Sequence, residues 1–416
     1  MKLSNRGKQL LAMAAMLGAT LGMASCGPGN TVDYVYVTSN LEGQVDAYAL
    51  DSLTGALLPL QSSPYPSGGR NPVYAVTSSV GPYLYVANHD DNTIAMFYIG
   101  IDGKLYPLQT VNTPGTEPVS LAINSGGTEL YVLDYYAPAA PGQPSYTDLN
   151  PGPGAVMVFP INSNGTLGSP LSVGAANYWK VQCFPTNMAI TPNNNFLYVT
   201  NTNAVVTTTS PPVSGTVPTL PATCPDYGTV SAFATGPSTA PLTEAGGSPF
   251  TTGAGSEPTG ITTDPGNGSI YVTDAALNRL YTFSIQSDGG ISLASATATG
   301  TMPMGTTVVS STGGNYLYVT NYTDGTVSSY TLASGTPAPL ATTSTGASGP
   351  LCLLVDPELS RFLYITDYTG GLVGGLELDP STGRLVQNQG SPYRTTGQPT
   401  CAVAHKNPRG RHNGLT

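Results

Sequence analysis

A short motif that begins with tyrosine, and reads Tyr-Val-Thr-Asn in its fullest form, recurs seven times along the chain. The copies start at Tyr36, Tyr85, Tyr131, Tyr198, Tyr271, Tyr318 and Tyr364. Most successive copies lie 46 to 49 residues apart, and two intervals are longer, at 67 and 73 residues. A period of about 40 to 50 residues is typical of the blades of a β-propeller. The motif therefore predicts an all-β fold with one copy in each of seven blades.

Each repeat contains four short runs with the composition or the alternating pattern of strands. The Tyr motif is the second run, and turns such as Asp102-Gly103 separate the third run from the fourth. A proline fits the first residue of a strand, because its missing N–H costs no ladder hydrogen bond there. The first run follows such a proline, at Pro72, Pro118, Pro185, Pro258, Pro303, Pro350 and Pro399. We therefore expect four-stranded blades, with the proline strand lining the central channel.

The two ends of the chain each supply part of one repeat. The N-terminal repeat opens directly with a second strand at 34–38, and the last proline strand, at 399–404, has no Tyr motif after it. If these segments pair, the N- and C-terminal strands share one blade and the ring closes without open edges. The sequence thus predicts a closed seven-bladed propeller over residues 27–406, followed by a tail at 407–416. Insertions at about 135–153 and 202–227 account for the two long intervals.

With these motifs, the chain resembles the YVTN-type propellers, a part of a wider group of seven-bladed proteins similar to 6-phosphogluconolactonase and muconate-cyclising enzymes. The resemblance covers nearly the whole chain, from about Asp33 to Lys406, and it rests on strand residues. It therefore implies the propeller fold. Because propellers host many functions, the resemblance leaves the activity open, with lactone hydrolysis as one implied possibility.

The charge balance limits the partners that the chain can bind. It has 13 basic and 23 acidic residues, for a net charge of −10. A nucleic-acid backbone needs a basic surface, and an anionic lipid surface would repel the chain. None of the short motifs that mark phosphate-binding loops, zinc proteases or EF-hands occurs. We expect no nucleic-acid partner, no cofactor and no metal, and a ligand that is a protein, a glycan or a small molecule.

The first 26 residues have the features of a signal peptide. Three basic residues precede an apolar run from Leu10 to Ala24, which is too short for a comfortable membrane span. The small residues before Cys26 resemble the lipobox of bacterial lipoproteins, in which this cysteine is lipidated. We expect an exported protein of the bacterial cell envelope, with lipidated Cys26 as its membrane anchor. Cleavage by the ordinary signal peptidase is the alternative, because Met23 stands where a lipobox usually has Leu.

Loop residues at one face of the propeller define the candidate site. The loops before the first strands share a face with the loops between the second and third strands. Glu117 and Glu257 precede their prolines at equivalent positions in the third and fifth blades, with His89 and Arg70 in neighbouring loops. A lactone hydrolase needs a general base for water, and a cation or donors for the oxyanion. These four residues are the catalytic candidates, and the alternative is that both glutamates are solvated loop carboxylates.

The sequence favours a binding or interaction module that uses this loop-rich face, with lactone hydrolase as the alternative. The resemblance implies more His and Arg around the channel mouth than this chain has, since it contains three His in all. The Asx residue that ends most Tyr motifs suggests either a polar ring or a turn at each strand end. A repeating turn explains a repeating residue, so we favour the turn. The motif tyrosines are expected to pack between sheets.

Four cysteines follow the signal peptide, and an oxidising compartment would allow two disulfides. Cys183 precedes the proline of the fourth blade, and Cys224 ends the long insertion of the same blade. A bridge between them would tether the insertion. Cys352 and Cys401 each lie two residues after a proline, on neighbouring inner strands. They form either a second disulfide or a pair of buried free thiols.

Overall fold

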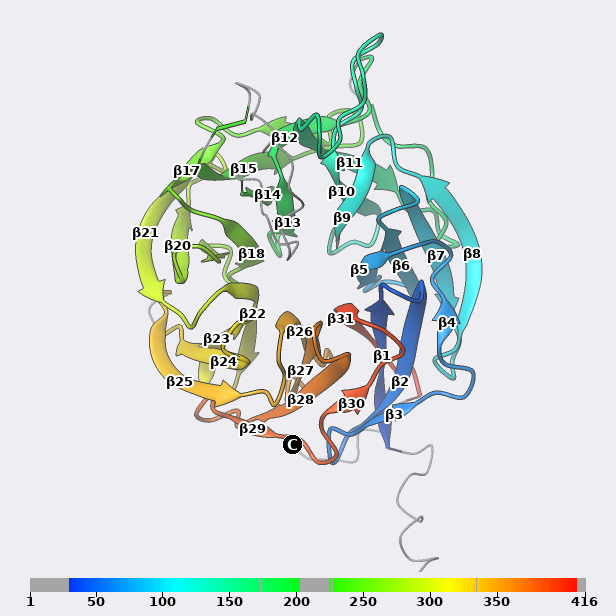
Figure 1. Cartoon of the computed structure of the whole chain (residues 1–416), viewed down its shortest axis with the longest axis vertical. Helices are drawn as coiled ribbons and strands as arrows, with labels where there is room; N and C mark the ends of the chain where they lie inside the picture. Colours follow the sequence, from blue (N-terminus) through cyan, green and yellow to red (C-terminus); the bar gives the residue numbers. More distant parts are fainter. Residues whose placement is uncertain (1–29, 173, 203–223, 226, 334, 410–416) are drawn as a thin grey trace, which may run out of the picture.

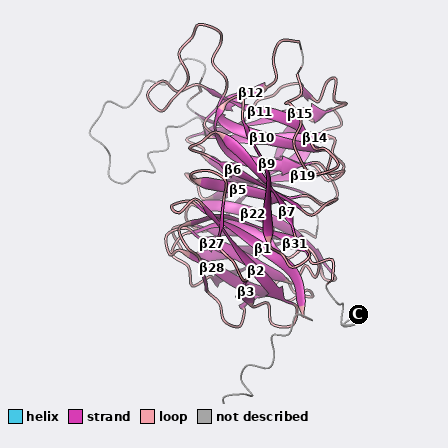
Figure 2. Ribbon diagram, turned by 90° about the vertical axis from the view of Figure 1, so that its right-hand side faces the viewer, coloured by secondary structure: helices cyan, strands magenta, loops and turns pink. Residues whose placement is uncertain are grey.

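The computed structural model describes residues 30–172, 174–202, 224–225, 227–333 and 335–409. Within this part, all regular secondary structure is β-strand, and 31 strands form seven sheets around a central axis (Figure 1). The edge-on view of Figure 2 likewise shows strands joined by loops. No described helix is long and apolar enough to cross a membrane. The expected all-β, seven-bladed propeller is confirmed, while the predicted signal peptide and lipobox lie outside the described residues.

Every blade has an inner strand, two middle strands and an outer position. The inner strands are β31 (Pro399–Lys406), β5 (Pro72–Thr77), β9 (Thr116–Ile123), β13 (Pro185–Ile190), β18 (Pro258–Thr263), β22 (Pro303–Ser311) and β26 (Pro350–Val355). The second strands, in the same order, are β1 (Thr31–Ser39), β6 (Tyr83–Asn88), β10 (Glu129–Tyr136), β14 (Phe196–Asn201), β19 (Ser269–Asp274), β23 (Gly314–Asn321) and β27 (Phe362–Asp367). The third strands are β2 (Gln44–Asp51), β7 (Thr93–Ile99), β11 (Pro153–Pro160), β15 (Tyr227–Thr235), β20 (Arg279–Ile285), β24 (Thr326–Thr331) and β28 (Leu372–Leu378).

The outer position is one strand in four blades and two short strands in the other three. The single strands are β8 (Leu105–Asn112), β12 (Trp179–Cys183), β21 (Ile291–Ala298) and β25 (Ala338–Ser344). The divided ones are β3 (Leu57–Pro59) with β4 (Tyr65–Pro66), β16 (Leu242–Glu244) with β17 (Phe250–Ala254), and β29 (Leu385–Gln387) with β30 (Tyr393–Arg394). In each divided pair, both pieces hydrogen-bond to the same third strand, so the blade keeps four strand positions.

The ring closes through the two ends of the chain. Strand β31 pairs antiparallel with β1, and Tyr34 lies opposite His405 while Tyr36 lies opposite Val403. This shared blade is the one that the sequence predicted, with the C-terminal strand inside and the N-terminal strand beside it (Figure 1). Each sheet therefore has a neighbouring sheet on both sides, and the inner strands turn their free edges toward the central channel.

The motif tyrosines join each blade to the next one. All seven are at most 1% exposed, so they form part of the packing between sheets. Six of their hydroxyls donate to the carbonyl of a glycine in the next blade's third-to-fourth-strand turn, as Tyr36 does to Gly103 at 2.7 Å and Tyr364 to Gly55 at 2.7 Å. Those six glycines have φ between +68° and +87°, which favours glycine. The hydrogen bond between blades therefore explains why both the tyrosine and the turn glycine recur in the repeat.

Candidate functional site

Two sets of loops meet on the side of the ring at which the inner strands begin, which we call the proline face. In six blades, the residue before the inner proline accepts a backbone hydrogen bond from the residue after the motif's Asx position. Examples are His89 N to Asn71 O and Ala275 N to Glu257 O, both at 3.0 Å. The loops before the first strands and those after the second strands therefore share this face. Both insertions follow second strands, so they begin on this face.

A cavity of about 370 Å³ lies in the central channel beneath the proline face. In all seven blades, the pairing of the inner strand with the second strand shifts register directly after the proline. Such a bulge leaves one or two residues outside the ladder and re-aims their side chains. The residues freed in this way, Val73, Val119, Thr186, Thr259, Gly260, Met304, Gly305, Leu351, Cys352, Thr400 and Cys401, all line the cavity. The bulges therefore build a binding space out of a repeated strand start.

Three side chains from two neighbouring blades come together on the proline face, next to the inner strand β9 and outside the set of residues that line the cavity. His89 and Asp90 follow β6, and Glu117 lies near the start of β9. The Nδ1 of His89 is 2.8 Å from Asp90 Oδ1, and its Nε2 is 3.9 Å from Glu117 Oε2. Asp90 is held in turn by Asn71, whose Nδ2 donates to Asp90 Oδ1 at 2.9 Å. The imidazole is thus oriented by one carboxylate while its other nitrogen faces a second one, beyond hydrogen-bond distance.

Glu117 is half-buried, and its surroundings change its acidity. Burial raises the pKa of this carboxyl, the charge of His89 lowers it, and the carboxylates of Asp148 and Asp90 raise it further, so the net shift is upward. Asp148 comes from the first insertion and accepts a hydrogen bond from Tyr136 at 3.0 Å. The adjacent Tyr135 lines the cavity, and Glu117 is among the charges that raise the pKa of its phenol. The carboxyl therefore interacts electrostatically with both the His89 imidazole and the cavity-lining Tyr135.

The backbone of Glu117 follows a pattern shared by several blades. Its φ is +61°, and Asn71, Phe184 and Met302 at the equivalent positions have φ between +52° and +57°. The Glu117 N–H donates to Asn92 Oδ1 at 2.7 Å, which fixes the start of the inner strand. Because four blades share this conformation, it reflects how the inner strand is entered and is no sign of chemistry peculiar to Glu117.

Arg70 does not act as a free cation at the mouth. Its guanidinium pairs with Asp91 Oδ1 at 2.7 Å, and its backbone N–H donates to Asp91 Oδ2 at the same distance. A further bond reaches Asp90 O at 3.3 Å. The side chain is 73% exposed, so the pair lies in solvent. Arg70 therefore holds the loop that carries His89 and Asp90.

Glu257 lies two blades away from Glu117 and has a different environment. Its backbone N–H donates to Asp274 Oδ1 at 3.1 Å. Burial raises the pKa of its carboxyl, and the carboxylate of Asp274 adds to the rise. Among the described residues, Asp274 is the charged neighbour that contributes to this shift. The structure therefore brings together His89 and Glu117, while Arg70 and Glu257 stay apart from them.

The Asx residues that end the motifs are buried parts of the frame. Asp274 Oδ1 accepts from the N–H groups of Glu257, Ala276 and Leu277, and Asp367 Oδ1 accepts from those of Gly349 and Gly370. Each such side chain joins the loop before its inner strand to the loop after its second strand. In the described residues, no group of three or more His, Cys, Asp or Glu is arranged to hold a metal ion. The turn interpretation fits these contacts.

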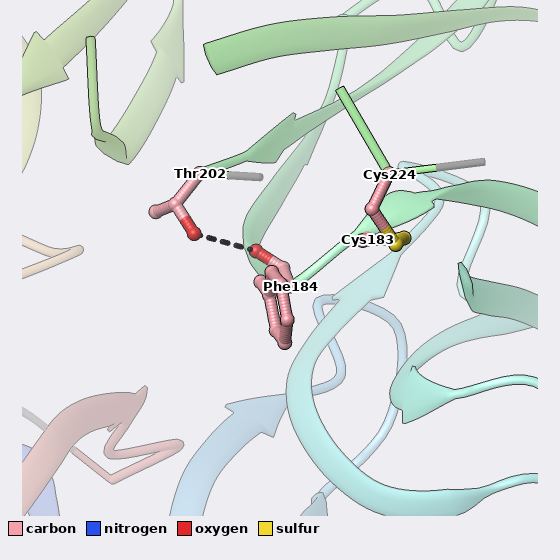
Figure 3. Close-up of a disulfide and its surroundings, with 4 residues drawn as sticks. All are labelled: Cys183, Phe184, Thr202 and Cys224. Atoms are coloured by element: carbon pink, nitrogen blue, oxygen red, sulfur yellow. Dashed lines mark hydrogen bonds between the residues drawn. A yellow bond between two sulfur atoms is a disulfide. The ribbon is translucent and has the colours of Figure 1, made fainter. Parts of the chain in front are cut away.

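The two cysteine pairs differ. Cys183 and Cys224 form a disulfide with a Cα–Cα distance of 5.4 Å, and Thr202 Oγ1 donates to the carbonyl of the adjacent Phe184 at 3.3 Å (Figure 3). The ring of Phe184 packs against Tyr135, with centroids 5.8 Å apart. The disulfide thus supports the wall next to Glu117.

The second bridge that the sequence allowed stays a prediction. Cys352 and Cys401 lie on the inner strands β26 and β31 of neighbouring blades, with their sulfurs 2.6 Å apart. Both side chains form part of the cavity wall.

A sequence-based choice of residues misses three parts of this site. In the sequence, Asp90 is one of several loop acids, although its position next to His89 is a usable signal. In the sequence, the cavity-lining residues Tyr74 and Tyr135 look like ordinary strand tyrosines. The bulges that re-aim inner-strand residues cannot be recognised from the sequence. The Glu117 environment also depends on Asp148, which lies in an insertion that has no counterpart in most repeats.

The closed seven-bladed propeller defines a class of protein. A family model described as "Lactonase, 7-bladed beta-propeller" matches residues 29–136 and 272–407, which is more than half of the chain. The chain therefore belongs to this lactonase propeller family, and the resemblance seen in the sequence is confirmed. The matched segments contain Arg70, His89 and Glu117, whereas Glu257 lies outside them.

Solved structures give the same fold at low sequence identity. A putative 6-phosphogluconolactonase from Bacteroides fragilis is 18% identical, with a TM-score of 0.70 over 92% of this chain and 100% of that one. The periplasmic gluconolactonase PpgL from Pseudomonas aeruginosa is 17% identical, with a TM-score of 0.70 over 91% of this chain and 100% of that one. No curated protein sequence gives a significant match. At this identity, the likeness shows the fold alone.

Proposed function

We propose that the protein is a lactone hydrolase whose reaction takes place at the mouth of the central cavity. The observation that carries the proposal is the arrangement of Asp90, His89 and Glu117 beside the cavity wall, in a member of the lactonase propeller family. The names of two structural neighbours, a putative 6-phosphogluconolactonase and a periplasmic gluconolactonase, support the same class of reaction. The alternative is a binding module, which would bind its ligand without converting it.

In this proposal, Glu117 is the general base. Its carboxylate takes a proton from water while the water oxygen bonds to the lactone carbonyl carbon. Because burial raises the pKa of the carboxyl, the carboxylate is a stronger base than an exposed one. The carbonyl oxygen becomes an oxyanion. Tyr135, which burial keeps protonated, offers an O–H donor to it at the cavity wall.

His89 is the general acid. When its ring is protonated, Nδ1–H donates to Asp90 and Nε2–H faces the reacting centre. As the tetrahedral intermediate collapses, the ring C–O bond breaks and the ring oxygen takes the Nε2 proton, so the product is an open hydroxy acid. Asp90 is a positioning residue that fixes the ring orientation and stabilises its charge. Exchange of protons with solvent restores Glu117 and His89.

The test is an assay of acid release from a panel of γ- and δ-lactones, with the purified protein and the variant H89Q. We expect turnover by the wild type, and a loss of about 10²- to 10⁴-fold in kcat/KM for H89Q, which is typical of a lost proton donor. Absence of turnover with every lactone would contradict the proposal. Saturable lactone binding without turnover would instead support the binding module.

We also propose that the protein is exported and anchored through lipidated Cys26. The basic and apolar pattern before this residue and the periplasmic location named for one structural neighbour support the proposal. The variant C26S should move from the membrane fraction to the soluble fraction of a bacterial host. A wild-type protein that is already soluble, with its N-terminus elsewhere, would contradict the anchor.

A further inference from the structure

The wall of the central cavity is mostly apolar in surface; it includes Tyr, Thr, Asn and Cys side chains but no Asp, Glu, Lys, Arg or His. Its lining includes Val73, Val119, Ile261, Met304, Leu351 and Leu353. These side chains belong to five different inner strands, so the apolar surface surrounds the cavity on most sides. Transfer of a charged or unpaired polar group into such a space costs free energy, whereas transfer of apolar surface is favourable.

Three of the threonine hydroxyl groups in the wall are used by the fold. Thr186 Oγ1 donates to Pro258 O at 2.9 Å, Thr259 Oγ1 to Pro303 O at 2.8 Å, and Thr400 Oγ1 to Pro72 O at 3.0 Å. Each bond joins one inner strand to the inner strand of the next blade. Among the described residues of the wall, Thr306 Oγ1 has no hydrogen-bond partner. A polyhydroxylated ligand would therefore find few free partners there, and each buried hydroxyl left unpaired would cost about 1–3 kcal/mol.

The charges around the mouth are the wrong ones for an anionic substrate. Glu117, Asp90 and Asp148 contribute like charges to one another at the mouth. Arg70, the cation of this region, is paired with Asp91. The sequence of the second insertion, 202–227, contains no Lys or Arg. A phosphorylated or carboxylated lactone would therefore be repelled by these carboxylates.

From these observations we infer that the substrate is a lactone whose ring substituent is uncharged and apolar, and that this substituent occupies the cavity. This inference rests on the proposed lactone hydrolysis at Glu117. A cavity of about 370 Å³ is at the small end of the ~300–1,000 Å³ typical of small-molecule sites. It suits a lactone fused to one aromatic ring or bearing a short alkyl chain.

The experiment compares dihydrocoumarin and δ-decalactone with glucono-δ-lactone and 6-phosphogluconolactone as substrates. We expect kcat/KM for the two apolar lactones to exceed that for the sugar lactones by at least about 10-fold, the scale on which pocket contacts discriminate between substrates. A preference for either sugar lactone would overturn the substrate class while leaving the hydrolase proposal intact.

A binding measurement separates the two proposals. The lactam 3,4-dihydroquinolin-2-one has the shape of dihydrocoumarin and resists hydrolysis. We expect it to bind the wild type and the variant E117Q alike in calorimetry. Lactam binding without hydrolysis of any lactone would contradict the hydrolase and support the apolar site. Failure of the lactam to bind would overturn the apolar site.

A pair of variants tests the role of the wall itself. M304K places a cation in the lining, and M304Q is its uncharged control of similar length. M304K should weaken lactam binding by about 10-fold or more relative to M304Q. If M304K fails to fold, as judged by its thermal unfolding, V119F provides the test by filling the cavity. Equal lactam affinity in wild type, M304K and V119F would place the ligand elsewhere and overturn the inference.

Discussion

The third and fifth blades carry a glutamate at the same position, directly before the inner proline, yet only one of them lies in a reactive setting. Glu117 faces His89 across 3.9 Å, and that imidazole comes from the neighbouring blade. Glu257 has Asp274 of its own blade as the charged neighbour that shifts its pKa. The repeat thus supplies the carboxyl, and the loop of the preceding blade decides what the carboxyl can do.

The largest expected effect separates these two glutamates. E117Q should lower kcat/KM for lactone hydrolysis by about 10²- to 10⁴-fold, because the amide cannot take the proton of water. E257Q is the matched control, with the same change at the same position of another blade, and should stay within about twofold of wild type. Equal losses in the two variants, or a larger loss in E257Q, would show that the two sites are wrongly assigned.

The pH dependence of kcat/KM provides the next test. Glu117 must be ionised to act as a base, and its pKa is raised above the ordinary value of 4.5. Activity should therefore fall as the pH drops through a midpoint above 4.5, and E257Q should leave that acid limb in place. An acid limb at or below 4.5 in the wild type would contradict the role of buried Glu117.

Asp90 should have a smaller effect, because it acts through His89. D90N keeps the size of the side chain but removes the carboxylate that holds His89 Nδ1. We expect a loss of about 10-fold in kcat/KM, because the ring is no longer held in place. The variant D91N removes the ion pair by which Arg70 holds the same loop, and it measures the effect of loop placement alone. A loss in D90N no larger than the loss in D91N would assign Asp90 a purely structural role.

The smallest effect on activity is expected from the disulfide that supports the Glu117 side of the mouth. C183A/C224A opens a link across 41 residues and should reduce the free energy of unfolding by about 2–4 kcal/mol. Because Phe184 packs against Tyr135, we expect a loss of a few-fold in kcat/KM as well. Denaturant unfolding and the lactone assay measure the two effects. Unchanged unfolding would contradict the supporting role.

The propeller could be predicted because its signals are local and repeated. The motif tyrosine, the turn glycine and the strand-opening proline each have the same cause in nearly every blade, and the shared terminal blade follows from counting them. The site could be predicted only in part. The repeat places Glu117, Glu257, His89 and Arg70 on one face, but it does not say which of them meet. That depends on which loop of a neighbouring blade comes within a few ångströms, as His89 does with Glu117.

The remaining features of the site come from departures from the repeat. The bulges after the prolines form the cavity through register shifts, and no residue pattern in the sequence predicts these shifts. Arg70 forms an ion pair with Asp91, which depends on how the two side chains lie in space. Cys352 and Cys401 occupy equivalent strand positions, as predicted, and their sulfurs meet across two separate sheets.

The most direct test of lactone hydrolysis at Glu117 and His89 is a crystal structure of the E117Q variant with dihydrocoumarin, since slow turnover should preserve the bound lactone. The lactone carbonyl should lie between the substituted side chain at position 117 and His89 Nε2, with the aromatic ring in the cavity. A water bound to that side chain should lie within about 3–3.5 Å of the carbonyl carbon. A lactone bound beside Glu257, or outside the mouth of the cavity, would contradict the account.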